Sequence, residues 1–219
     1  MKKSCLWRDS GRVMKQIDTI IFDLGGVLID WNPEYVFLDA FDGNREKMQW
    51  FLDTVCTMGW NENQDTGYPV KQATEDLVKQ FPEHENYIKM YYGEWEKMLG
   101  GPINGTVEIL KKLIDSKQYK VVALTNWSNE TFPIAQKRFE FLNWFEGIVV
   151  SADEKTRKPF KDIYNICLNR FDISPEKSIF IDDSLRNINA ASELGIHGIH
   201  FKNPKQLNKE LKSFNINLS

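Results

Sequence analysis

The chain has few cysteines, no long hydrophobic run and no apolar leader. Its 219 residues include only three cysteines, widely spaced at positions 5, 56 and 167. An odd, scattered set does not suit a disulfide framework and favours reduced thiols, so we expect a cytoplasmic protein. No apolar run approaches the ~20 residues of a membrane helix, and the N-terminus lacks the apolar segment of a secretion signal. We therefore expect no association with a membrane.

The chain also has only a small excess of charge of one sign. The chain has 28 basic and 31 acidic residues and a formal net charge of -3, which argues against a nucleic-acid partner. Its hydrophobic content of 42% is typical of a globular protein that can bury a core. Residues 1–16 are polar and aperiodic for most of their length, so we expect an N-terminal tail, with Met14 as a candidate start.

The apolar pattern predicts alternating strands and helices. Buried-strand patterns occur over residues 20–22, 121–126, 147–151, 178–183 and 197–201. Helical spacing or helix-start signals occur over residues 107–114, 132–141, 163–171 and 187–194, and from Pro204 onward. Strands separated by helices of this length form a parallel sheet, so we predict a Rossmann-like, doubly wound α/β fold.

Residues 31–100 interrupt this alternation. The segment is rich in aromatic, acidic and amide residues, shows helical spacing in patches and contains no clear strand pattern. The segment begins next to the end of the first strand, where ligands bind in open α/β sheets. We predict a helical cap over residues 31–100, inserted into an α/β core made of residues 17–30 and 101–219.

Polar residues follow four of the predicted strands: Asp23, then Thr125 with Asn126, then Lys158, then Asp182 with Asp183. The carboxyl ends of parallel strands meet at one edge of the sheet, so these side chains are expected to converge. Two carboxylates 4 Å apart repel by roughly 4 kcal/mol at an effective dielectric constant of about 20, and one lysine does not neutralise three acids. Magnesium, which binds carboxylates and phosphate oxygens, would do so.

Each of these residues also has an ordinary structural role. An aspartate or threonine after a strand often caps the next helix, and a single lysine is usually a solvated loop charge. The acid pair at positions 182 and 183 could cap the helix that follows it. Four polar strand ends in this order are hard to explain by such roles together, so we favour the functional interpretation.

With these motifs, the chain resembles the haloacid dehalogenase-like hydrolase superfamily, in the branch that has a helical cap after the first motif. The segments DLGGVL, ALTN, RKP and FIDDSLRN match its four motifs in order and type, and the resemblance covers residues 17–201. It implies a phosphatase in which Asp23 attacks the phosphoryl group and forms an aspartyl-phosphate. Lys158 would offset the phosphoryl charge, assisted by phosphate-binding residues at Thr125, Asn126 and Asn187.

The resemblance also implies a magnesium site. Its protein ligands would be Asp23, the carbonyl of Gly25 and Asp183, with Asp182 in the outer shell or bracing Lys158. The implied partner is a small phosphorylated substrate such as a sugar phosphate, and we expect a monomer or weak homodimer.

Gly25 departs from the family pattern. Most phosphatases of the superfamily carry there the aspartate that protonates the leaving oxygen, although certain bacterial sugar-phosphate phosphatases resemble this chain in having glycine. General acid catalysis is worth ~10²–10⁴-fold in rate, so another donor is expected. We hypothesise that it comes from the cap, as Glu62 or Asp65, or from water.

Two other functions remain open. A 2-haloacid dehalogenase would use the same aspartate without a metal, but Gly25 and the acid pair count against it. A weakly active protein that binds a phosphorylated metabolite is the second alternative. Further candidates for lining the site are Trp31, Asn32, Trp60, Asn61, Trp127 and Ser128.

Overall fold

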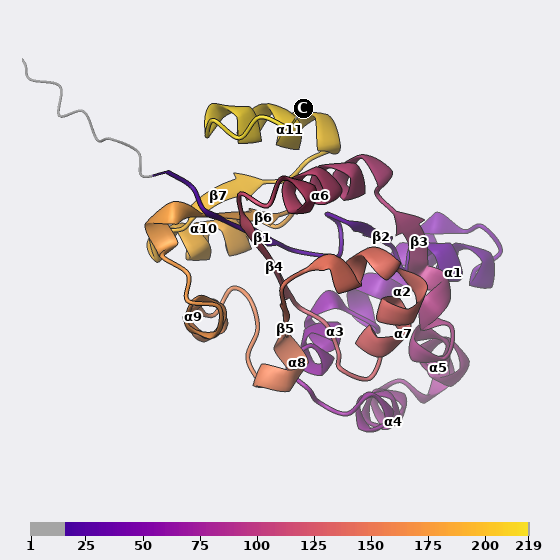
Figure 1. The fold of residues 1–219 in the computed structure, drawn as a ribbon. Coiled ribbons are helices and arrows are strands. Elements are labelled where there is room, and N and C mark those ends of the chain that lie inside the picture. Colours follow the sequence, from indigo (N-terminus) through magenta and orange to yellow (C-terminus); the bar gives the residue numbers. More distant parts are fainter. Residues whose placement is uncertain (1–15, 219) are drawn as a thin grey trace, which may run out of the picture.

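The computed structural model describes residues 16–218, so Met14 and all but the last residue of the expected tail lie outside the described residues. The described chain has a five-stranded parallel sheet in the order β5-β4-β1-β6-β7 (Figure 1). Its strands are β1 (Thr19–Phe22), β4 (Lys120–Thr125), β5 (Ile148–Val150), β6 (Ser178–Asp182) and β7 (His197–His200). The predicted doubly wound α/β fold is therefore confirmed.

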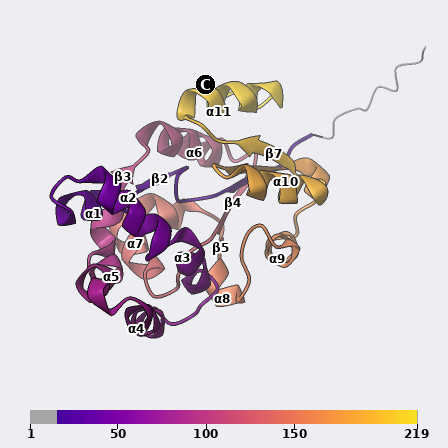
Figure 2. The same cartoon turned by 180° about the vertical axis from the view of Figure 1, so that it is seen from behind.

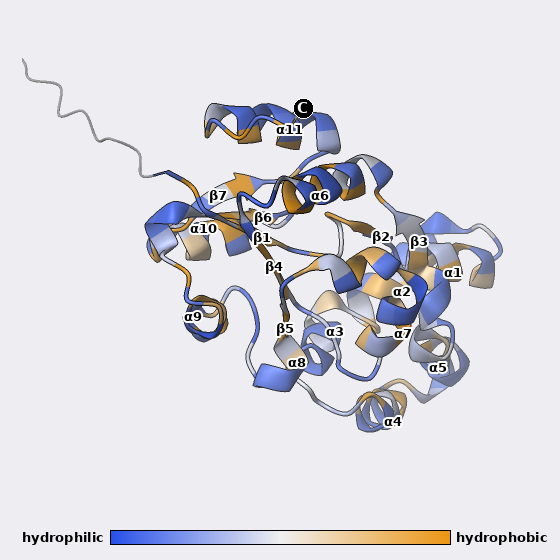
Figure 3. Ribbon diagram, in the orientation of Figure 1, coloured by the Kyte–Doolittle hydropathy of each residue, from blue (hydrophilic) through white to orange (hydrophobic). Residues whose placement is uncertain are grey.

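Helices cover both faces of this sheet, because successive residues of each strand point to opposite sides. Ile20 and Phe22 pack into one apolar cluster, and Ile21 packs into the other. Figures 1 and 2 show α6 and α11 on one side of the sheet and α9 and α10 on the other. Figure 3 shows hydrophobic colour on the strands between them. These helices are α6 (Asn104–Ser116), α9 (Lys161–Arg170), α10 (Leu185–Glu193) and α11 (Pro204–Ser213).

The ends of these elements agree with local sequence signals. Asn203 caps α11 by accepting a hydrogen bond from the Gln206 N–H at 2.9 Å, and Gly195 follows α10 with a φ of 87°. Two predicted boundaries are wrong. The helix expected over residues 132–141 ends early, since α7 (Phe132–Arg138) is followed by a 3-10 turn. Ser151, expected in a strand, begins the short helix α8 (Ser151–Glu154).

A helical insertion, which we define as residues 32–98, separates β1 from the rest of the sheet. Its helices are α1 (Glu34–Ala40), α2 (Arg45–Thr54), α3 (Met58–Gln64), α4 (Val70–Gln80) and α5 (Glu85–Gly93). Aromatic rings form its interior: Phe37, Phe51 and Tyr91 are at most 1% exposed, and Phe37 lies 5.2 Å from Phe51 between ring centroids. These aromatic residues belong to the same apolar cluster as Ile20 and Phe22, so the interior of the insertion is continuous with that of the core.

The insertion is joined to the core by an antiparallel ribbon that the sequence did not predict. It pairs β2 (Ile29–Trp31) with β3 (Leu99–Pro102), so the expectation of no strand within residues 31–100 is wrong at both ends. Gly100 is needed there because a Cβ would lie 2.5 Å from Asp30 Oδ2. No helix in the described part of the chain has the length and apolar character to cross a membrane.

Candidate active site

The carboxyl ends of β1, β4 and β6 bring three of the expected polar residues to one edge of the sheet. Asp23 directly follows β1, whereas Thr125 and Asp182 are the last residues of β4 and β6. All three are buried, and β1 lies between the other two strands. The parallel register, which aligns Phe22 with Ile181, explains why residues far apart in the sequence meet here.

Lys158 lies among these carboxylates. Its Nζ is 2.8 Å from Asp23 Oδ1 and 2.7 Å from Asp182 Oδ2, and it donates to the Leu124 carbonyl at 3.1 Å. The lysine side chain is 1% exposed. A buried ammonium is stable only when its protons have partners, and here each of the three has an acceptor.

The buried charges shift one another's pKa values. Burial raises the pKa of Asp23 well above its ordinary value, since leaving water disfavours the anion; Lys158 opposes this, and Asp182 and Asp183 add to it. Burial alone would lower the pKa of Lys158, but the carboxylates of Asp182 and Asp23 outweigh it and raise that pKa. The three acids and one lysine therefore leave the site with more negative than positive charge, as expected from the sequence.

Asp183 completes a group that could hold a metal ion. One carboxylate oxygen from each of Asp23, Asp182 and Asp183 lies within 4.8 Å of the others. Burial and Asp182 raise the pKa of Asp183. Among residues 16–218, Asp23 Oδ2 has no hydrogen-bond or ion-pair partner, and the Asp183 carboxylate has none on another residue and bonds only to its own backbone. These oxygens are the ones left available to a cation.

Asp182, in contrast, has both oxygens engaged. Oδ2 contacts Lys158, and Oδ1 accepts from the Ser184 N–H at 2.8 Å. The Asn187 amide donates to both oxygens, at 3.0 and 3.1 Å. Of the two placements expected for Asp182, these contacts favour bracing Lys158 over binding a metal.

The two asparagines assigned to phosphate binding hold other site residues through their side chains. Asn126 Oδ1 accepts from the Lys158 N–H at 2.8 Å, and its Nδ2 donates to the Lys158 carbonyl at 3.0 Å. Asn187 uses its Nδ2 on Asp182. Both residues line the cavity, but their amide nitrogens position Lys158 and Asp182. Sequence order alone could not reveal this, since the pairs are up to 32 residues apart.

The two glycines after Asp23 differ sharply in their surroundings. A Cβ built on Gly25 meets nothing within 4 Å. A Cβ on Gly26 would lie 2.2 Å from Asp183 Oδ2, and Gly26 has a φ of 71° that favours glycine. Gly26 is thus required for the close approach of Asp183, whereas the position of Gly25 has room for a side chain.

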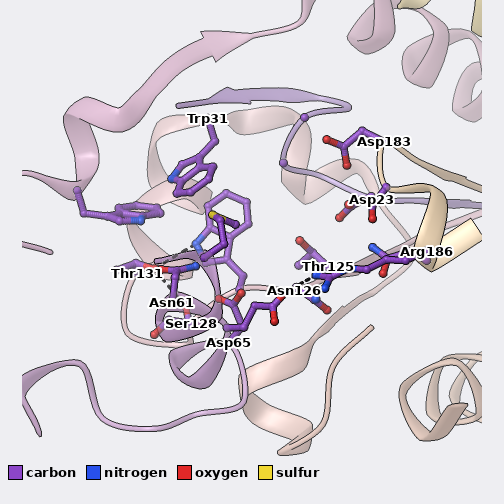
Figure 4. Close-up of a pocket in the computed structure, with 18 of the residues that line it drawn as sticks. Asp23, Trp31, Asn61, Asp65, Thr125, Asn126, Ser128, Thr131, Asp183 and Arg186 are labelled. Carbon is purple, nitrogen blue, oxygen red and sulfur yellow. Dashed lines mark hydrogen bonds and ion pairs between the residues drawn. The ribbon is translucent and has the colours of Figure 1, made fainter. Parts of the chain in front are cut away.

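A cavity of about 460 Å³ opens onto this cluster and reaches the insertion (Figure 4). Of the further candidates, Trp31, Asn61, Trp127 and Ser128 line it. Asn32 and Trp60 do not: Asn32 caps the backbone of Glu34, and the Trp60 ring packs on Tyr91. Other lining residues were not predicted from the sequence: Ser184 and Arg186, which lie within the segment FIDDSLRN, and Met58, Tyr92, Trp95 and Thr131, which no motif marks.

The insertion contacts the core beside the cavity. Glu62 pairs with Arg157 at 2.6 Å, and also with Arg186 at the start of α10. The Ser151 hydroxyl donates to the Asp65 carbonyl at 2.5 Å. These contacts hold the end of α3 against the strand-end loops that carry Lys158 and Asp183.

The sequence and fold that carry this cluster of acids and lysine are similar to those of known proteins. The sequence profile of the family described as haloacid dehalogenase-like hydrolase matches residues 20–201. The chain belongs to this family. Family membership confirms the resemblance drawn from the four motifs and makes the protein a hydrolase.

This hydrolase is similar to individual proteins in sequence and to a solved structure in fold. Acyl-CoA dehydrogenase family member 10 of Mus musculus is 34% identical and covers 94% of this chain, which spans only 20% of the mouse protein. A glyceraldehyde 3-phosphate phosphatase of Pyrococcus furiosus is 31% identical, with 92% of this chain and 88% of that protein covered. A HAD family enzyme from Bacteroides thetaiotaomicron, solved as a magnesium complex, is 24% identical with a TM-score of 0.68 over 86% of this chain and 95% of that chain.

Proposed function

We propose that this protein is a magnesium-dependent phosphatase that hydrolyses a small phosphomonoester through an aspartyl-phosphate on Asp23. The observation that carries the proposal is that Asp23, which lines one cavity with Asp183, lies 2.8 Å from Lys158 Nζ and offers an oxygen within 4.8 Å of one on Asp183. The similarity to the glyceraldehyde 3-phosphate phosphatase of Pyrococcus furiosus supports the reaction class.

The residues present fit a magnesium ion. Magnesium binds one or two carboxylates and keeps other positions for water and phosphate oxygens. Asp23 and Asp183 offer such oxygens, and the Gly25 carbonyl is the proposed third protein ligand. The magnesium complex of the Bacteroides thetaiotaomicron enzyme supports this assignment. When bound, the ion would offset the negative charge of the carboxylates and the phosphoryl group.

The chain's own residues supply the remaining chemistry. An oxygen of Asp23 attacks phosphorus and the bond to the leaving oxygen breaks, which gives an aspartyl-phosphate. Lys158 stabilises the charge on the phosphoryl oxygens, because its ammonium is fixed by three acceptors and needs no reorganisation. Thr125 is proposed to bind a phosphoryl oxygen from the end of β4. Water then attacks the aspartyl-phosphate and releases inorganic phosphate.

We further propose that the helical insertion acts as a cap that excludes water and selects the substrate. Asn61 and Tyr92 of the insertion line the cavity together with Asp23 and Thr125 of the core, and Trp31, at the end of β2, lines it as well. The Tyr92 hydroxyl donates to Asn61 Oδ1 at 2.9 Å, which fixes that part of the wall. Flat aromatic surfaces and amides suit the faces and hydroxyls of a sugar phosphate or a similar molecule.

Magnesium removal tests the proposed reaction. Hydrolysis of p-nitrophenyl phosphate and of a panel of sugar phosphates is expected to fall by at least ~10²-fold in EDTA and to return with added magnesium. Phosphate release measures this. Chloride release from 2-chloropropionate in EDTA would instead support a dehalogenase, although a haloacid anion would meet uncompensated carboxylates.

The two glycines give a matched pair for the metal site. Gly26→Ala is expected to raise the magnesium concentration needed for half-maximal activity by ~10-fold or more, because its Cβ would displace Asp183. Gly25→Ala keeps the backbone carbonyl and meets no atom within 4 Å, so it should change that requirement far less. Isothermal titration with magnesium checks both variants, and equal effects would contradict the proposed role of Asp183.

A further inference from the structure

Two acidic side chains near the end of α3 reach the cavity, and only one of them lacks a partner. Glu62 is held by Arg157 at 2.6 Å and by Arg186. The carboxyl group of Asp65 has no hydrogen bond or ion pair to any residue in the described range 16–218. The contacts therefore separate two residues that the sequence left as equal candidates for a proton donor, since protonating Glu62 would break both of its ion pairs.

Asp65 is fixed at the cavity by its backbone. Its carbonyl accepts a hydrogen bond from the Ser151 hydroxyl at 2.5 Å, and the same hydroxyl accepts from the Trp127 N–H at 2.9 Å. Ser151 is fully buried, so this link ties Asp65 to the chain two residues after Thr125. Figure 4 shows Asp65 and Asp23 among the side chains around one cavity, the first from the insertion and the second from the core.

The position of Gly25 leaves the leaving-group side of Asp23 without a donor of its own. A Cβ there meets nothing within 4 Å, so no neighbouring side chain fills that space. A proton donor supplied by the chain itself must then come from elsewhere on the cavity wall. Among the acids that line the cavity, Asp23 and Asp183 belong to the charged cluster and Glu62 is ion-paired, which leaves Asp65.

We propose that Asp65 is the general acid of the phosphatase reaction, supplied by the insertion in place of a side chain at position 25. This inference rests on the proposed phosphatase function. As the bond from phosphorus to the leaving oxygen breaks, its electron pair stays on that oxygen, which takes the proton of Asp65 and departs as an alcohol. In the second half-reaction the water that attacks phosphorus passes a proton to the Asp65 carboxylate, which restores the acid.

The surroundings of Asp65 keep a protonated form available near neutral pH. Burial raises the pKa of Asp65 to about 7, and the charge of Glu62 acts in the same direction. Arg157 and Lys158 oppose this. From α5, the neutral hydroxyls of Tyr91 and Tyr92 also lie in the field of Asp65, and burial keeps both tyrosine pKa values raised. A general acid is most effective with its pKa close to the working pH.

The test compares leaving groups. Wild type, Asp65→Asn and Glu62→Gln are assayed with magnesium on p-nitrophenyl phosphate, which has a good leaving group, and on glycerol phosphate, which has a poor one. Asp65→Asn is expected to lower kcat/KM for glycerol phosphate by roughly 10²-fold and that for p-nitrophenyl phosphate much less. Glu62→Gln makes the same carboxyl-to-amide change on the same segment, so it should keep the wild-type ratio between the two substrates.

A second variant supplies an acid at position 25 in place of Asp65. Adding Gly25→Asp to the Asp65→Asn protein places a carboxyl where a Cβ has room, and it is expected to restore much of the lost kcat/KM for glycerol phosphate. The alkaline decline of kcat/KM above pH of about 7, expected in wild type, should be absent in Asp65→Asn. Equal losses on both substrates, or no loss on either, would overturn the role of Asp65. A wild-type protein inactive on both would overturn the phosphatase proposal itself.

Unfolding by urea gives a readout that does not depend on activity. The folded-state pKa of Asp65 is raised from 3.8 to about 7, so wild type loses stability as pH rises through this window. Asp65→Asn has no proton to lose there. The urea midpoint of Asp65→Asn minus that of wild type should therefore increase from pH 4 to pH 8. A difference that stays constant with pH would contradict the buried, unpaired state of Asp65.

Discussion

Asp23→Asn is expected to lower kcat for phosphomonoester hydrolysis by at least ~10³-fold while leaving the fold intact. The amide cannot attack phosphorus, and it removes one of the oxygens offered to magnesium. Acid quenching of wild type during turnover should trap one phosphoryl group on Asp23, detectable by mass spectrometry of the peptide, whereas the variant should trap none.

The fold of this variant can be checked independently. Asn at position 23 can still accept the Leu24 N–H that bonds Asp23 Oδ1 at 2.8 Å, and Lys158 retains Asp182 as its counterion. One of three repelling carboxylates is lost, so the urea midpoint without magnesium should stay equal or rise. Asp18→Asn makes the same change just before β1, at the opposite end of that strand, and serves as the activity control. Equal activity of Asp23→Asn and wild type would contradict the proposed nucleophile.

Lys158→Met is expected to lower the free energy of unfolding by about 3–5 kcal/mol, the range observed when one partner of a buried ion pair is removed. The variant leaves the carboxylates of Asp23 and Asp182 buried without their shared cation. Activity should be lost as well, because nothing then offsets the phosphoryl charge. Urea unfolding at neutral pH in EDTA measures the stability change.

Two further variants show whether this loss comes from the buried charges. Adding Asp182→Asn to Lys158→Met removes one uncompensated carboxylate and is expected to recover part of the stability. Lys161→Met, on an exposed lysine 3.1 Å from Glu193, should change the free energy of unfolding by only about 0.5 kcal/mol. A similar effect of Lys158→Met and Lys161→Met would mean that the buried pair contributes little.

The element sequence of the core could be predicted from local patterns because β1, β4, β5 and β6 are short apolar runs followed by polar residues. The same reasoning failed for β2 and β3, which are only three and four residues long. Segments of this length are too short to show a strand pattern in the sequence, and pairing between residues about 70 positions apart makes them strands. The boundary error at α8 has a similar origin, since Ser151, the first residue of that helix, makes a tertiary contact with Asp65.

The candidate site, like the fold, could be predicted from the sequence only in part. Residue type and order at the strand ends were enough to propose Asp23, Thr125, Lys158 and the acid pair as one site, because parallel strands carry their carboxyl ends to one edge. The amide contacts of Asn126 and Asn187 could not be predicted, because side-chain partners depend on distances that the sequence does not encode locally.

The sequence by itself determined the family, the parallel α/β core and the absence of an acid at Gly25. Only the tertiary structure decided between Glu62 and Asp65. Both lie on the same short segment with the same charge, but Arg157 and Arg186 converge on Glu62 from two parts of the core. Asp65 lines the cavity and forms no ion pair with any basic residue in the described range 16–218. The field at each carboxylate depends on charges that folding brings close, and that is why the two acids differ.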